Sequence, residues 1–216
     1  MTMPRIPAPA PVTAPAQPSQ LTRRGLLALA ACAVAAPRPG LAAPATAAQA
    51  LTLLQNSSWI ADGSIGAHRV VYVFTDPNCP YCNKFWAEAR PWVQAGKVQL
   101  RHVIVGILTP ESPGKAAALL SAPNPAVALA AYESGQVSAT AQALASGHPH
   151  PLSNQGLQPL SVIPAALTAR LQANAALMQA LGLQATPAVV WRDDTGELQA
   201  RTGVTPRTLN EAMGPR

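Results

Sequence analysis

The sequence predicts an α/β fold with a helical insertion, and three observations support this prediction. Residues 70–74 form a run of β-branched and aromatic residues, Val-Val-Tyr-Val-Phe, which is typical of a buried strand. After a short turn, apolar residues recur at helical spacing within residues 79–95. A second strand-like run at 188–192 precedes an Asp-Asp-Thr-Gly turn and a returning strand at 197–201. Strands that alternate with helices in this way predict helices packed on a sheet.

The remaining elements are expected in chain order around this frame. A strand at 98–105 follows the first helix, in which Pro91 removes a backbone hydrogen bond and predicts a kink. An Ala/Leu-rich insert of about 111–182 comes next, and a helix from about residue 206 closes the fold. Within the insert we expect helices near 113–121, 125–134 and 173–182, and a Pro-rich loop at 147–164.

Residues 1–47 are expected to be a leader, made of a twin-arginine export signal and an Ala/Pro-rich segment. Arg23 and Arg24 precede an apolar run that ends at Ala36, and small residues follow, which is the order of a signal peptide. The run is shorter than the roughly 20 residues that a membrane-spanning helix needs. Cys32 within it also fits a lipid-modified anchor, and an unstructured tail with a chance arginine pair is the remaining alternative. We expect a periplasmic protein, either released or anchored through Cys32.

The charge of the chain argues against nucleic-acid binding. The whole sequence has a net charge of +6, but four of its 15 basic residues lie in the leader. Removing the leader leaves 11 basic against nine acidic residues, a net charge of +2. No cluster of Lys and Arg remains after that, so the basic footprint of a nucleic-acid-binding protein is missing from the sequence.

The cysteines carry the main functional signal. Besides Cys32 there are two, in the motif Cys79-Pro80-Tyr81-Cys82 at the start of a predicted helix. Unpaired backbone N–H groups and the helix dipole favour a thiolate at Cys79, which should lower its pKa. Cys82, one turn later, can attack a mixed disulfide at Cys79, and Pro80 suits the first turn of a helix. The motif therefore predicts dithiol–disulfide exchange.

Two other interpretations of the cysteine pair are weaker. A structural zinc site would need two histidine ligands besides the cysteines, and nothing in the sequence associates any histidine with them. A purely structural disulfide would close a loop of almost no residues and add little stability. We expect no metal, no cofactor other than the redox-active pair, and surface or loop positions for the four histidines, His68, His102, His148 and His150.

A second motif, Thr186-Pro187, directly precedes the strand-like run at 188–192. One interpretation is an ordinary proline at the entry of a strand. The other is a cis-proline loop that faces the cysteine pair, where backbone groups would hold an extended substrate peptide. Thr186 and Pro187 are therefore candidate substrate-binding residues.

Several stretches together resemble one protein family. They are Trp-Ile-Ala-Asp-Gly-Ser at 59–64, residues 71–82, Phe-Trp at 85–86, Ala-Arg-Pro-Trp at 89–92, Gly-Lys-Val-Gln-Leu-Arg at 96–101, Pro-Glu-Ser-Pro at 110–113 and Thr-Pro at 186–187. On these motifs, residues 59 to about 213 are similar to the catalytic domain of the DsbG-like members of the DsbC/DsbG family of periplasmic disulfide isomerases and reductases. The resemblance implies a thioredoxin fold with a helical insertion, Cys79 as nucleophile, Cys82 as resolving cysteine, and Thr186-Pro187 as the substrate-facing loop.

The domain organisation is expected to depart from that family. Its members carry an N-terminal dimerisation domain, joined by a linker helix to the catalytic domain. Residues 48–69 are too few for a domain with its own core, so we expect them to be a remnant of the linker, ahead of a thioredoxin-fold catalytic domain at 70–216. We therefore expect a monomer.

The expected function is thiol–disulfide exchange on exported proteins with disulfides or oxidised cysteines. The resemblance implies a DsbD-type membrane reductase as partner of a reduced pair, and a DsbB-type oxidase as partner of an oxidised one. The residues leave open whether the chain is an isomerase or reductase or a DsbA-like dithiol oxidase, because the potential depends on Pro80, Tyr81 and the Cys79 pKa. The alternative from another class is a peptide-binding or chaperone-like module in which the cysteine pair is incidental.

Overall fold

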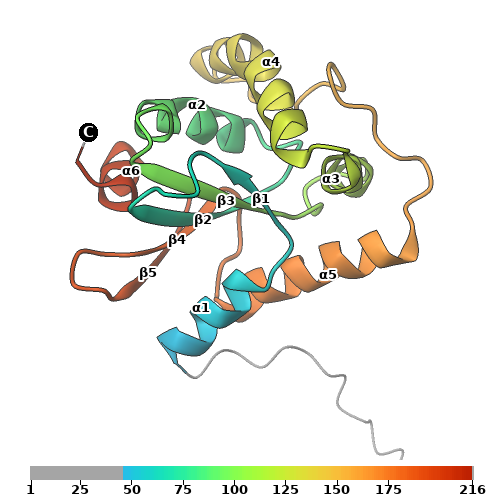
Figure 1. Ribbon diagram of the computed structural model, residues 1–216. Helices are drawn as coiled ribbons and strands as arrows, with labels where there is room; N and C mark the ends of the chain where they lie inside the picture. The colour runs from blue at the N-terminus through green and yellow to red at the C-terminus, as the bar shows by residue number, and fades with distance from the viewer. Residues whose placement is uncertain (1–45, 216) are drawn as a thin grey trace, which may run out of the picture. The chain divides into compact units, whose positions relative to one another are not determined.

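The computed structural model describes residues 46–215, which form a five-stranded sheet flanked by helices (Figure 1). The strands are β1 Trp59–Asp62, β2 Arg69–Thr75, β3 Val98–Ile104, β4 Ala188–Arg192 and β5 Leu198–Thr202. The helices are α1 Ala47–Gln55, α2 Pro80–Gln94, α3 Ser112–Ser121, α4 Pro125–Ala145, α5 Ala165–Ala180 and α6 Pro206–Met213. The expected arginine pair Arg23-Arg24 and Cys32 lie outside the described residues.

The sheet has the strand order β1-β3-β2-β4-β5. Strands β2 and β3 are parallel and are connected through α2, whereas the β2–β4, β4–β5 and β1–β3 pairs are antiparallel. This mixed sheet with helices on both faces is the predicted α/β fold with its helical insertion. The central strand β2 ends at Thr75, so the chain leaves the middle of the sheet just before the cysteine motif.

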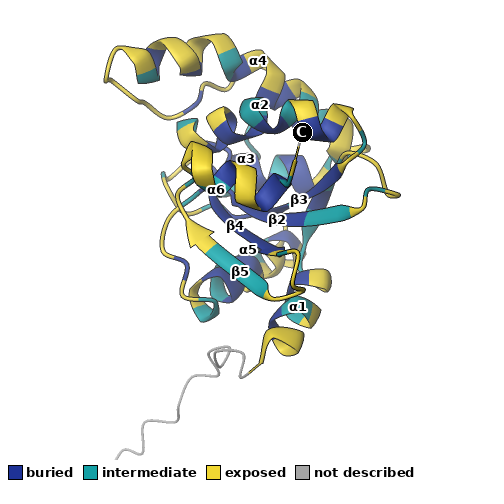
Figure 2. Cartoon of the chain, turned by 90° about the vertical axis from the view of Figure 1, so that its left-hand side faces the viewer, coloured by how far each residue is buried: buried dark blue, intermediate teal, exposed yellow. Residues whose placement is uncertain are grey.

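The alternation of side chains along β2 builds the core on both faces of the sheet. Val71 and Val73 pack with α2 and α6, whereas Tyr72 and Phe74 pack with residues of α1 and α5. Figure 1 shows the same division, with α2 and α6 on one face and α1 and α5 on the other. The insert helices α3, α4 and α5 share a further buried cluster with Ile60 and Ile104, and Figure 2 shows the buried residues gathered between helices and sheet.

The structure differs from the sequence prediction at three element boundaries. Residues 59–62, expected in the linker, form strand β1 and extend the sheet beside β3, so the sheet includes residues assigned above to 48–69. Helix α4 continues past Gly135 to Ala145, well beyond the predicted end at 134, because Gln136, Thr140 and Ala143 are buried on its inner face. Helix α5 begins at Ala165, directly after Pro164, and not at 173. In each case tertiary burial extends an element that local signals would end or omit.

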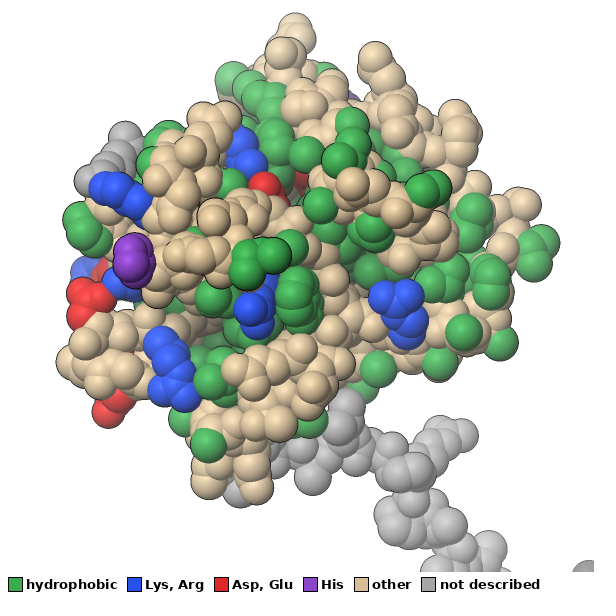
Figure 3. All heavy atoms as spheres, in the orientation of Figure 1, with side chains coloured by type: hydrophobic (Ala, Val, Ile, Leu, Met, Phe, Trp, Pro, Cys, Tyr) green, Lys and Arg blue, Asp and Glu red, His purple; other side chains and the backbone are tan. Residues whose placement is uncertain are grey.

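The surface agrees with the low charge that the sequence shows after residue 47. On the face drawn in Figure 3, the Lys and Arg side chains are separated by neutral ones and do not merge into a basic patch. No helix within residues 46–215 combines the length and the apolar character needed to cross a membrane.

Candidate active site

Strand β2 and the turn that follows place Cys79 at the N-cap of α2. Its backbone is extended, with φ −85° and ψ 109°, and its sulfur accepts a hydrogen bond from the backbone N–H of Cys82 at 3.2 Å. Pro80 occupies the first helical position, where a missing N–H costs nothing. Both thiols are free and buried, each residue being 2% exposed. The sulfur of Cys79 thus takes the place of the side-chain oxygen that normally caps a helix.

The two thiols have opposite electrostatic environments. The hydrogen bond with the Cys82 side chain is the main cause that lowers the pKa of Cys79, and it outweighs the opposing effect of burial. Burial is the main cause that raises the pKa of Cys82 well above its ordinary value. Cys79 therefore forms the thiolate first, while Cys82 keeps its proton, which is the asymmetry that a nucleophile and a resolving thiol require.

The loop at Thr186-Pro187 faces this pair. The peptide bond between the two residues is cis, and the thiol of Cys79 donates a hydrogen bond to the carbonyl oxygen of Thr186 at 3.4 Å. The Thr186 hydroxyl is buried, and the Thr186 side chain is one of the groups that lower the pKa of Cys79. A small pocket of about 170 Å³ lies between this loop and α2. Its lining includes Tyr81, Lys84, Phe85, Glu88, Thr186, Pro187, Gly203 and Val204.

The predicted site residues therefore come together from distant parts of the chain. Cys79, Cys82 and Thr186 are joined by hydrogen bonds, Tyr81 and Pro187 line the same pocket, and Tyr81 is 52% exposed beside the buried sulfurs.

A buried carboxylate behind the site was not singled out from the sequence. Asp76 is 0% exposed, and one of its oxygens accepts from the backbone N–H of Asn78 and the hydroxyl of Ser112, both at 2.8 Å. The other oxygen accepts from the backbone N–H groups of Ile107 and Leu108, at 2.7 and 3.0 Å. Asp76 thereby ties the turn before Cys79 to the start of the insert. The Thr-Asp-Pro-Asn run predicted only a turn, because the partners of Asp76 other than Asn78 lie 31 or more residues away.

The expectation that all four histidines lie on the surface or in loops is wrong for His102. It is 1% exposed in β3, with Nδ1 3.0 Å from the Thr75 hydroxyl and Nε2 3.4 Å from a carboxylate oxygen of Asp62. Asp62 also forms a two-bond ion pair with Arg90 of α2. The sequence could not show this, because β1 supplies the carboxylate. The other three histidines, His68, His148 and His150, are exposed as expected.

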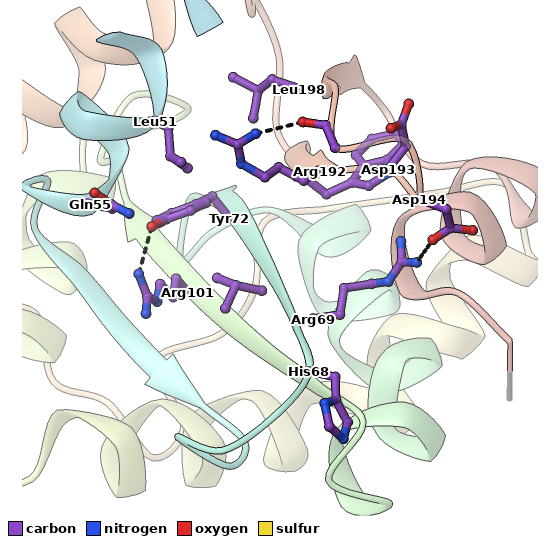
Figure 4. A pocket seen from close by; sticks show the side chains of 13 residues that line it. Leu51, Gln55, His68, Arg69, Tyr72, Arg101, Arg192, Asp193, Asp194 and Leu198 are labelled. Atoms are coloured by element: carbon purple, nitrogen blue, oxygen red, sulfur yellow. Dashed lines mark hydrogen bonds and ion pairs between the residues drawn. The ribbon is translucent and has the colours of Figure 1, made fainter. Parts of the chain in front are cut away.

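The described part of the chain shows no candidate metal site, and its pocket at the start of β2 lies away from the cysteine pair. Residues 46–215 contain no group of three or more His, Cys, Asp or Glu side chains that could hold a metal ion. A pocket of about 510 Å³ lies by the start of β2, whereas Cys79 follows the end of that strand (Figure 4). Its arginines are engaged within the protein: Arg69 pairs with Asp194, and Arg101 donates to the Tyr72 hydroxyl at 2.7 Å. None of the predicted site residues lines it.

The model of the thioredoxin-like domain family matches residues 64–214, which span the sheet strands β2 to β5 and the cysteine motif. The chain belongs to the thioredoxin-like family. Within this family it is DsbG-like: it is 44% identical over 164 residues to the thiol:disulfide interchange protein DsbG of Pseudomonas aeruginosa, and 40% identical over 162 residues to that of Escherichia coli.

These matches cover unequal shares of the proteins compared. The two alignments cover 76% and 74% of this chain but only 58% and 59% of the DsbG proteins, so the chain spans less than two thirds of the length of these curated relatives. The thioredoxin-like fold is also that of solved structures. The catalytic domain of Proteus mirabilis ScsC has a TM-score of 0.52 at 22% identity, over 76% of this chain and 95% of that one. A periplasmic thioredoxin-like protein of Salmonella enterica has a TM-score of 0.54 at 19% identity, over 77% and 97%.

Proposed function

We propose that this thioredoxin-like domain is a periplasmic thiol:disulfide oxidoreductase that works through Cys79 and Cys82. The single observation that carries the proposal is the Cys79 thiol at a helix N-cap, with its pKa lowered, beside a cis-proline loop. The likeness to DsbG proteins at 40% and 44% identity supports the same activity. The Cys-Pro-Tyr-Cys motif assigns the roles of the two cysteines within it.

In the proposed reaction, the cysteine pair supplies the two electrons that reduce a substrate disulfide. The Cys79 thiolate attacks a substrate disulfide, forming a mixed disulfide and releasing one substrate thiolate. Cys82 then loses its proton and attacks the Cys79 sulfur, which releases the second substrate thiolate and leaves a Cys79–Cys82 disulfide. The substrate is reduced by two electrons and the pair is oxidised. In the reverse direction the pair donates its disulfide to a substrate dithiol.

Thr186 and Pro187 are proposed to hold the substrate. The Thr186 carbonyl is within 3.4 Å of the Cys79 sulfur, so a peptide strand placed along this loop would bring its own cysteine next to the nucleophile. The Thr186 hydroxyl is buried, so the bound chain would contact the backbone of this loop. No cofactor beyond the cysteine pair takes part in this proposal.

The proposed substrates are exported proteins with disulfides or oxidised cysteines, and a monomer suffices for the exchange steps above. A DsbD-type membrane reductase would return the oxidised pair to the dithiol form. The twin-arginine motif would direct export, and Cys32 would carry the anchor if the protein is lipid-modified. The reduction potential indicates the direction of electron flow: a value near −120 mV would favour oxidation or a pair kept reduced by a partner, and about −270 mV a general reductase.

The test compares two single variants on a peptide with a fluorescent disulfide. Cys82→Ser should attack once and remain as a mixed disulfide that a reductant releases, because no resolving thiol is present. Cys79→Ser is the matched control. It keeps only the buried Cys82, so it should form the adduct far more slowly than Cys82→Ser does. Equal adduct formation by the two variants, or none by either, contradicts the assigned roles.

One observation favours a second function. Besides Tyr81, the side chains of Ile107 and Leu108 are each 47% exposed, and both of their N–H groups bond Asp76 behind the site. Exposed apolar side chains of this kind suit the binding of unfolded chains. A Cys79→Ser/Cys82→Ser variant separates the functions: a binding module keeps its suppression of aggregation of a denatured client, whereas exchange activity is lost.

A further inference from the structure

Lys115, in the first part of helix α3, is a buried cation beside the active-site turn. It is 0% exposed, although lysine is among the residues least often buried. Its ammonium nitrogen lies 2.6 Å from the side-chain oxygen of Asn78, and 2.7 and 3.0 Å from the backbone oxygens of Leu152 and Ser153. The hydroxyl oxygen of Tyr132 is 3.2 Å away.

These contacts identify the charged form of the side chain. All four neighbours present oxygen lone pairs, since the Tyr132 hydroxyl itself donates to the carbonyl oxygen of Pro77 at 2.7 Å. An ammonium group has three N–H donors and a neutral amine only two, so this set of acceptors is matched by the ammonium. Within residues 46–215 no carboxylate lies within ion-pair distance of Lys115. Neutral oxygens therefore replace the water that the charge has lost.

The contacts also reach the residue that precedes the nucleophile. The Asn78 side chain is oriented from both ends: its oxygen accepts from Lys115, and its amide donates to the hydroxyls of Thr109 and Ser112 at 2.8 and 3.1 Å. The Asn78 carbonyl accepts from the N–H of Leu152 at 3.3 Å. Hydrogen bonds consequently hold the turn before Cys79 against the insert, and Lys115 lies at the centre of this hydrogen-bond network.

Lys115 also has an electrostatic relation to the site. The negative charge of Asp76 opposes ionisation of Cys79 and so raises the pKa of that thiol. Burial lowers the pKa of Lys115, while the charges of Glu111 and Asp76 act in the opposite direction. Lys115 and Asp76 are thus buried charges of opposite sign that attract each other behind the same turn.

We propose that Lys115 is a positioning residue for the redox pair: its ammonium fixes the Asn78 turn that carries Cys79 and offsets the negative charge of Asp76 behind it. Its consequence for catalysis rests on the proposed function, but its effect on the Cys79 thiol does not. The competing explanation is purely structural, in which Lys115 only joins the 146–164 loop to helix α3. The two explanations agree on stability and differ on the chemistry of Cys79.

The experiment measures the Cys79 thiolate in the full chain with Lys115→Met. The pH dependence of iodoacetamide alkylation of the reduced protein, followed at Cys79 by peptide mass, gives the pKa of this thiol. Without the ammonium, no buried cation offsets the charge of Asp76, so the pKa of Cys79 should rise by about one unit and alkylation below the pKa should slow about ten-fold. The reduction potential against glutathione should become more negative, because the thiolate that stabilises the dithiol form is lost.

Asn174→Ala is the matched control. Asn174 is 1% exposed in α5 and bonds the backbone of Ser58 and Ile104, and none of these hydrogen bonds involves residues 76–82. It should lower the urea midpoint, as Lys115→Met does, and leave the Cys79 pKa unchanged. Lys115→Gln is a second variant that keeps a donor towards Asn78 without the charge, and provides the same titration if Lys115→Met does not fold.

Two outcomes decide the inference. A raised Cys79 pKa in Lys115→Met and Lys115→Gln, with none in Asn174→Ala, supports the positioning role. A parental Cys79 pKa and reduction potential in both Lys115 variants, with stability lost as in Asn174→Ala, overturns it in favour of the structural explanation. If the parent protein exchanges no disulfide with any substrate, the proposed function fails, while the alkylation titration still decides the role of Lys115.

Discussion

A buried carboxylic acid next to the redox helix gives the protein a defined pH dependence. Glu133 of α4 is 1% exposed, and its carboxylate accepts a hydrogen bond from the side-chain amide of Asn83 at 2.6 Å. The same amide donates to the Glu133 backbone oxygen at 2.8 Å. Asn83 directly follows Cys82, so this contact joins the insert to the active-site helix. Burial raises the pKa of Glu133 to about 7, although Asn83 and Arg90 oppose the shift.

The size of the effect follows from this pKa. The ordinary value is 4.5, so the folded state binds this proton more tightly by about 2.5 units. At 1.36 kcal/mol per unit, the difference corresponds to about 3 kcal/mol of the free energy of unfolding. The folded state holds the extra proton, so the stability is fully present below pH 4.5 and is lost as the pH rises to about 7.

Glu133→Gln tests this directly, because the amide keeps an oxygen acceptor for Asn83 and cannot ionise. Between pH 5 and pH 8, urea unfolding should show that the parent protein loses about 2.5 kcal/mol more than the variant, because part of the effect is already lost at pH 5. The variant should therefore be the more stable protein at pH 8. Glu88→Gln is the control, since Glu88 has a 38% exposed side chain paired with Lys84, and it should change stability by less than about 1 kcal/mol at both pH values.

Equal pH dependence of stability in the parent protein and in Glu133→Gln would contradict this prediction. If Glu133→Gln and the parent protein show the same difference in stability between pH 5 and pH 8, Glu133 does not titrate in that window. A variant that is less stable at pH 8 than the parent would show that the ionised carboxylate is the favoured partner of Asn83.

Three further perturbations test other parts of the structure. Asp62→Asn removes the carboxylate that pairs with Arg90 and faces His102, and should cost about 3 kcal/mol in urea unfolding at pH 7. Burial opposes ionisation of Asp62, but its hydrogen bonds to His102 and Arg90 outweigh burial and hold the pKa of Asp62 well below the usual range. The stability deficit of Asp62→Asn should therefore shrink as the pH falls below about 4. An unchanged deficit at pH 3 would argue against the ion pair. Gly106→Ala places a Cβ 2.8 Å from the Cα of Pro113 in α3, which should lower the free energy of unfolding by about 1–3 kcal/mol, and a neutral result would mean that the helix shifts freely. Trp92→Phe removes the 2.9 Å bond from the indole N–H to the Gly214 carbonyl in a side chain 1% exposed, and a thermal midpoint equal to that of the parent would contradict the expected loss of about 1–3 kcal/mol.

The elements that carry the redox site could be predicted because their signals are local. The apolar strand 70–74, the turn after it and the helix from Pro80 are contiguous in the sequence, and the structure gives β2 and α2 almost within those limits. The strand pair near the C-terminus was equally clear, since a turn with Gly196 separates two short strands. Four-residue strand β1 had no such signal, because its partners in β3 and the insert helices are distant in the sequence.

The candidate site divides in the same way. Cys79 and Cys82 were evident from their spacing, and Thr186-Pro187 from the position of proline before a strand. The burial of three polar residues was not evident, because each has partners from other elements. These are Asp62 and Thr75 for His102, Asn83 for Glu133, and Asn78 for Lys115. A polar residue in a helix or strand pattern gives no sign of whether such partners exist.

The sequence by itself determined the α/β class and the position of the cysteine pair at a helix start, because strand patterns, turns and helical spacing depend on residues close together in the chain. Only the tertiary structure decided which groups surround that pair. The Thr186 carbonyl lies 107 residues from Cys79, and the Lys115 ammonium lies 37 residues from Asn78. Burial removes water from all of these polar groups, so each must find a protein partner, and that partner is set by how the helices and strands pack.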